Sequence, residues 1–149
     1  MSRTLAYLSI LICTSALVVI SICAPSHLSN QNAFLSDFVG PQFLSILGVI
    51  LAITLASVAN LHLAFNRIEE VHKKRGAFIK SRQNLKKAAS WLIGLFIAGT
   101  AVVVVKPIAA HSDVSEALFN SASLIILLCH ILILISLTEL VFKIEPEFS

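Results

Sequence analysis

Residues 117–142 read ALFNSASLIILLCHILILISLTELVF, and this stretch decides the class of fold. Apart from the Cys129 thiol, its ionisable side chains are His130 and Glu139, and the stretch exceeds the roughly 20 apolar residues that an α-helix needs to cross a bilayer. A buried helix of a soluble domain rarely carries so long an apolar run. We therefore expect residues 117–142 to form a transmembrane helix.

Three further apolar runs precede this one, at residues 5–24, 42–65 and 88–105. Only 13% of the chain is charged, against about 25% in soluble domains. The first run is long enough to span, so we interpret it as a signal anchor rather than a cleaved signal peptide. The sequence predicts an all-α, polytopic membrane protein, with residues 1–149 forming one membrane domain of four transmembrane helices.

The distribution of basic residues predicts the orientation. Eight of the eleven Lys and Arg residues lie in one loop, residues 66–87, between the second and third runs. These residues are Arg67, Lys73, Lys74, Arg75, Lys80, Arg82, Lys86 and Lys87. Because basic loops stay in the cytoplasm, we expect this loop and both termini to be cytoplasmic.

The basic loop also has helical spacing of apolar residues, interrupted at Gly76. We expect the second helix to continue into the cytoplasm, turn near Gly76 and return as a helical hairpin into the third. The hairpin has three interpretations: a solvated topology determinant, a surface for anionic lipid headgroups, or a docking site for a cytoplasmic partner. Direct nucleic-acid binding is disfavoured, because no nucleic-acid-binding module is recognisable.

The fourth run carries polar residues on one helical face. They are Glu116, Asn120, Ser123, His130 and Thr138. Polar residues within a span avoid lipid and face protein or water. One interpretation is an interface between helices, in which His130 is hydrogen-bonded to a neighbour. The other is a water-accessible path or an oligomer axis lined by this face.

Small residues recur at steps of four in the two middle runs, a spacing that lets another helix backbone approach closely. They are Gly48, Ala52 and Ala56 in the second run, and Gly94 and Ala98 in the third. We expect these residues to mediate helix packing.

No catalytic, cofactor-binding or metal-binding motif is present, so we expect no enzyme and no cofactor. Cys13, Cys23 and Cys129 form no C-x-x-C pair, which disfavours a thiol oxidase. His62 and His130 are predicted at different depths, which disfavours paired ligation of a haem. Function is therefore expected in the loop or in the polar face.

The basic loop begins Asn66-Arg67-Ile68 and ends Arg82-Gln83-Asn84-Leu85-Lys86-Lys87, between the middle helices of a short chain with inward termini. In this layout the chain resembles the small four-helix membrane proteins of bacterial anti-phage systems, such as Kiwa membrane subunits and RexB-like exclusion proteins. The resemblance implies a homo-oligomeric sensor of the bacterial inner membrane that docks a cytoplasmic protein on its basic loop. The alternative function is a small pore or ion channel lined by the fourth helix.

Overall fold

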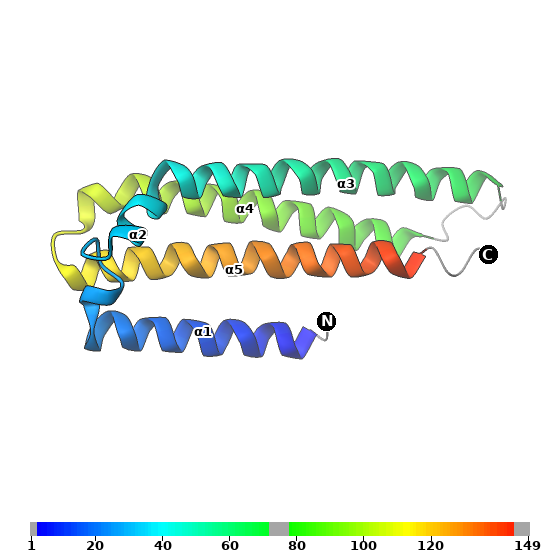
Figure 1. The fold of residues 1–149 in the computed structure, drawn as a ribbon. Helices are drawn as coiled ribbons and strands as arrows, with labels where there is room; N and C mark the ends of the chain where they lie inside the picture. Colours follow the sequence, from blue (N-terminus) through cyan, green and yellow to red (C-terminus); the bar gives the residue numbers. More distant parts are fainter. Residues whose placement is uncertain (1–2, 72–77, 145–149) are drawn as a thin grey trace.

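The computed structural model describes residues 3–71 and 78–144 of the chain. Four long helices run side by side (Figure 1). They are α1 (Arg3–Cys23), α3 (Phe43–Val71), α4 (Ile79–Ala109) and α5 (Asp113–Ile144). The connection from α1 to α3 contains the short helices η1 (Pro25–His27) and α2 (Ala33–Asp37), followed by η2 (Phe38–Gln42), a kinked turn in which Val39 and Gly40 have non-helical backbone angles.

Within the described residues, four helices are long and apolar enough to cross a membrane. This confirms the predicted all-α, four-span architecture. We call the end of the bundle with Val71 and Ile79 the hairpin end, and the end with residues 24–42 and 110–112 the loop end. The first turn of α1 and the last turn of α5 both point toward the hairpin end (Figure 1). The side of the membrane on which that end lies stays a prediction.

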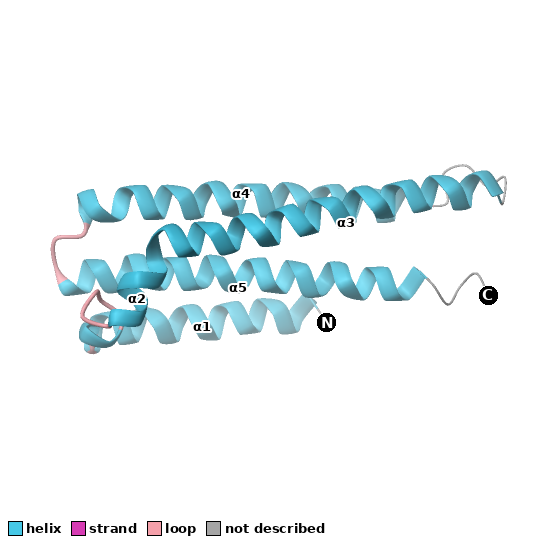
Figure 2. Cartoon of the chain, turned by 45° about the horizontal axis from the view of Figure 1, so that its top comes forward, coloured by secondary structure: helices cyan, strands magenta, loops and turns pink. Residues whose placement is uncertain are grey.

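Helix α5 is the centre of the bundle, because it packs against α1, α3 and α4. Helices α3 and α4 pack against each other as an antiparallel pair, whereas α1 lies beside α5 (Figure 2). Apolar side chains of α1 such as Leu11 and Ile22 are 65% and 60% exposed, as expected for side chains that face lipid. Because α5 packs against three helices of the same chain, its polar side chains can contact protein rather than lipid.

Two buried apolar clusters hold the bundle, one in each half. The loop-end cluster includes Phe43, Leu47 and Ile126, and it is covered by side chains of the α1–α3 connection, including Leu35 and Phe38. The hairpin-end cluster consists of Phe65, Leu85, Leu92 and Leu137. The turn before α3 is kinked at Gly40, where φ is −169° and ψ is −135°, which folds the connection back over the bundle.

Inside the chain, most of the small residues spaced four apart do not face another helix, and whether they mediate packing between chains stays a prediction. Ala52, Ala56, Gly94 and Ala98 are exposed, and a Cβ added at Gly94 would meet nothing within 4 Å. The close approach occurs instead at Gly99, where a Cβ would lie 2.8 Å from Leu47 Cδ1 and 3.2 Å from Phe43 Cε1. Gly48 lies nearer the seam, with its Cβ position 3.8 Å from Phe96 Cε2.

The physical reason for this difference is the helical rotation of about 100° per residue. Gly99 follows Ala98 directly, yet one step turns the side-chain direction from lipid to the α3–α4 seam. Both faces of a membrane helix are apolar, so the spacing alone does not distinguish the face that meets a helix from the face that meets lipid.

Candidate functional site

The hairpin end is joined by an aromatic stack and an ion pair. The rings of Phe65 in α3 and Phe78, the residue before α4, stack with centroids 4.7 Å apart. The Glu69 carboxylate accepts hydrogen bonds from Arg82 Nη2 at 3.0 Å and from the backbone N–H of Phe78 at 3.2 Å. These contacts hold the end of α3 against the start of α4. The predicted continuation of both helices beyond their apolar runs is confirmed, whereas the predicted turn near Gly76 lies outside the described residues.

The predicted docking residues fall into three groups in the structure. Lys73, Lys74 and Arg75 lie outside the described residues. Arg67, Lys80, Lys86 and Lys87 are exposed on the hairpin. Arg82 is only 27% exposed, because its guanidinium is held against Glu69. The structure thus separates one basic residue that stabilises the hairpin from four that remain available at its surface.

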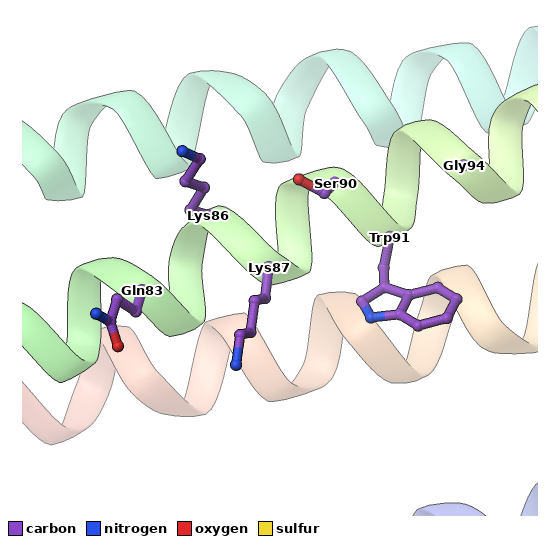
Figure 3. A pocket seen from close by; sticks show the side chains of 6 residues that line it. All are labelled: Gln83, Lys86, Lys87, Ser90, Trp91 and Gly94. Atoms are coloured by element: carbon purple, nitrogen blue, oxygen red, sulfur yellow. The ribbon is translucent and has the colours of Figure 1, made fainter.

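A groove lies on the outward face of α4 where the hairpin meets the apolar span (Figure 3). It has a volume of about 510 Å³ and is lined by Gln83, Lys86, Lys87, Ser90, Trp91 and Gly94. The Lys86 and Lys87 side chains point to different sides of α4, and Trp91 projects on the same side as Lys87 (Figure 3). We call this the α4 groove.

A second groove of about 650 Å³ runs between α3 and α4. At one end it is lined by His62, Arg82, Gln83 and Lys86. Deeper along the helices the lining is apolar and includes Leu55, Val58, Ala59 and Ala89. We call this the α3–α4 groove. Since Gln83 and Lys86 line both grooves, the two meet at the basic end of the span.

The polar face of α5 binds the α1–α3 connection at the loop end. Glu116 Oε2 accepts a hydrogen bond of 3.0 Å from the backbone N–H of Asn30. Asn120 Nδ2 donates to the Leu28 carbonyl at 2.7 Å, and Asn120 is fully buried. These bonds join residues that are 86 and 92 positions apart in the sequence, and so attach the α1–α3 connection to α5.

Further along α5, polar side chains are enclosed within the single chain. Ser123 and His130 are fully buried, and each hydrogen-bonds to a carbonyl one turn earlier in α5, those of Phe119 and Ile126. Because a carbonyl only accepts, His130 Nδ1 is the donor, and in the neutral imidazole Nε2 is then a buried acceptor. Neither His130 Nε2 nor Asn120 Oδ1 has a hydrogen-bond partner in the described part of the chain.

Thr138 departs from this pattern. It is exposed and lines a small cavity of about 150 Å³ between α3 and α5, together with Thr54 and Ser57. The predicted face is therefore not one continuous lining. Burial of Asn120, Ser123 and His130 within one chain favours the interface between helices over an axis between subunits, because a side chain at a subunit interface is exposed in the isolated chain.

Sequence reasoning missed the partners of this face and two further polar contacts of α5 beside it. Ser21 of α1 and Ser121 of α5 share a buried hydrogen bond of 2.9 Å, and Gln31 Nε2 donates to Asp113 Oδ2 at 2.8 Å. The only signal in the sequence was the polar composition of residues 26–32. Two of the partners are backbone groups, those of Leu28 and Asn30. Nearly every residue type has these groups, so the sequence does not reveal them.

The residues that the structure describes contain no group of three or more His, Cys, Asp or Glu side chains able to hold a metal ion. What they define is a polytopic α-helical membrane protein with a basic hairpin end and an internally bonded loop end. No protein-family model, curated protein or solved structure matches this chain.

Proposed function

We propose that this chain is a non-enzymatic, homo-oligomeric component of a bacterial inner-membrane defence or membrane-sensing complex, and that its hairpin end docks a cytoplasmic protein. One observation supports the proposal: the hairpin end is a basic helical extension in which side-chain contacts hold α3 and α4 together. Residues 79–87 precede the uncharged stretch 88–105 and add about 13 Å of helix beyond it. The Glu69–Arg82 ion pair and the Phe65–Phe78 stack hold this extension in place.

The two ends of the bundle differ in the charge that they leave available. At the hairpin end Arg67, Lys80, Lys86 and Lys87 are exposed. At the loop end the carboxylates of Asp113 and Glu116 accept hydrogen bonds from the α1–α3 connection. A partner with an acidic surface would therefore be attracted to the hairpin end, where charge complementarity raises the rate of association.

Oligomer formation is supported by the exposed small residues of α3. Ala52 and Ala56 lie one turn apart on a surface that no helix of the described chain covers. Small residues at this spacing let a second helix approach closely in a membrane. A second copy of the chain is the partner that we propose for this face.

The alternative, a small pore lined by the polar face of α5, has less support. Asn120, Ser123 and His130 are enclosed by the chain itself, and two of the three hydrogen-bond to carbonyls of their own helix. Current across planar bilayers that changes in the His130→Leu variant would favour the pore over the docking function.

The experiment is co-expression of the tagged full chain with the products of its neighbouring genes, followed by purification in mild detergent. We expect a neighbouring cytoplasmic protein to be retained, and the variant with Arg67→Glu and Lys80→Glu to lose it. His111→Glu, an exposed change at the loop end, is the control and should retain the partner. Recovery of the chain alone, or equal loss in the control, would count against the proposal.

A further inference from the structure

We propose that the two grooves that meet at Lys86 form a binding site for one anionic phospholipid of the leaflet at the hairpin end. The phosphodiester headgroup would lie at Lys86 and Lys87, one acyl chain would occupy the α4 groove, and the other would occupy the α3–α4 groove. The inference stands apart from the proposed function, because it requires no protein partner.

The charges around the grooves fit an anionic headgroup. Lys86 and Lys87 are exposed, both line the α4 groove, and Lys86 also lines the α3–α4 groove. None of the residues that line either groove is acidic. The amide of Gln83, shared by both grooves, adds hydrogen-bond donors. A phosphate oxygen placed at Lys86 and Lys87 meets cations and an amide donor, whereas Arg82, at the edge of the α3–α4 groove, is already paired with Glu69.

The depth of the site fits the boundary between headgroups and acyl chains. Trp91 lies one turn deeper than Lys87 and is 68% exposed, and tryptophan is enriched at this boundary. From Lys87 to Gly94 the helix rises about 10 Å, which carries the α4 groove from the headgroup level into the hydrocarbon. Lysine at such a level extends toward the headgroups while its stem stays apolar.

The shape of the α3–α4 groove fits an amphiphile rather than a free phosphate. His62 and Arg82 lie at its polar end, while Val58 lies about 6 Å and Leu55 about 10 Å deeper along α3, at the apolar end. An ion without acyl chains would leave that apolar lining unfilled. Because the deeper part of the groove faces the bilayer, an acyl chain enters it without leaving the hydrocarbon.

The α4 groove extends along the helix as far as Gly94, because glycine has no side chain to fill the space there. A Cβ at Gly94 meets nothing within 4 Å, so the space in front of it is open. A leucine there would begin from a Cβ that touches nothing and would extend into this open space. Ala98, one turn deeper on the same exposed side of α4, lines neither groove and offers a matched control.

The test is native mass spectrometry of the full chain, titrated with dioleoyl phosphatidylglycerol or with dioleoyl phosphatidylcholine. We expect phosphatidylglycerol to bind at least about tenfold more tightly, as expected for two basic residues beside one anionic headgroup. The double variant Lys86→Gln with Lys87→Gln should weaken phosphatidylglycerol binding about 25-fold, at about fivefold for each basic residue removed near the headgroup.

Two controls separate this site from general attraction. The variant with Arg67→Gln and Lys80→Gln removes the same charge from the hairpin end but touches neither groove, and it should bind within about twofold of the wild type, since Lys80 lies about a Debye length from Lys86. Gly94→Leu should weaken binding about tenfold, the contribution of roughly two buried methylene groups, whereas Ala98→Leu should not.

Three results would overturn the proposal. They are equal binding of the two lipids, equal loss in the Arg67 and Lys80 variant, and full displacement of the lipid by millimolar glycerol phosphate, which has no acyl chains. Size-exclusion elution and helical circular dichroism of each variant verify that it is folded before its binding is compared.

Discussion

The Glu69 carboxylate and the Arg82 guanidinium meet at 3.0 Å, across a sequence separation of 13 residues, and so join the end of α3 to the start of α4. The same carboxylate accepts the backbone N–H of Phe78, which lies just before the first turn of α4. One side chain therefore sets both the angle and the starting point of the returning helix.

Replacing Glu69 should loosen the hairpin. Glu69→Ala removes the hydrogen bonds to Arg82 and to the Phe78 backbone and leaves Arg82 without its carboxylate, so we expect a loss of about 1–2 kcal/mol of stability. Thermal unfolding in detergent, followed by circular dichroism, should show a melting temperature a few degrees lower. Glu70→Ala is the control, because Glu70 is an exposed carboxylate one residue away. Equal losses in the two variants would refute the role of the ion pair.

The α3–α4 seam should tolerate a side chain at one glycine of α4 and not at another. Gly99→Leu places a side chain against Leu47 and Phe43, both fully buried, and we expect a loss of about 1–3 kcal/mol from overpacking. Gly94→Leu, on the open face, should melt within about a degree of the wild type. A reversed order of melting temperatures would mean that the seam lies on the other face of α4.

His130 should be replaceable by an apolar residue of similar size. Its Nε2 is a buried acceptor without a partner in the described chain, and such an atom costs about 1–3 kcal/mol. His130→Leu should therefore unfold at the same temperature as the wild type or higher, whereas His130→Ala should lose about 2–4 kcal/mol by opening a cavity. If leucine is as damaging as alanine, the Nε2 atom has a partner in the assembled protein.

The predicted orientation has a direct test by cysteine labelling. In a variant without native cysteines, Ser112→Cys should react with a membrane-impermeant maleimide added to spheroplasts, because Ser112 is exposed at the loop end. Lys80→Cys at the hairpin end should react only after the membrane is opened. The opposite pattern would place the basic hairpin outside the cytoplasm.

The four spans and the hairpin were predictable from the sequence because they depend on the length of apolar runs and on the position of charges. The environment of the α5 polar face was not. Asn120 binds the carbonyl of Leu28, and any residue type supplies a carbonyl. Ser21 and Ser121 are each ordinary in a membrane helix, and only the fold brings them together.

The sequence also could not show which glycine of α4 packs against α3. Gly94 and Gly99 both lie in the apolar part of α4, but only Gly99 contacts the loop-end cluster. In a soluble helix the polar face would have marked the outside. In a membrane helix lipid and protein interior are equally apolar, so residue type carries little information about direction.

The placement of α1 against α5 has a consequence for biosynthesis. The Ser21–Ser121 bond joins residues 100 positions apart, and α1 packs mainly against a helix that the ribosome makes last among the four. At about 5–20 residues per second, α1 waits for about 5–20 s in the bilayer before its main partner emerges. The α3–α4 hairpin can assemble during that interval. The order of translation therefore sets the order of assembly, and α5 arrives last and packs α1 against the α3–α4 pair.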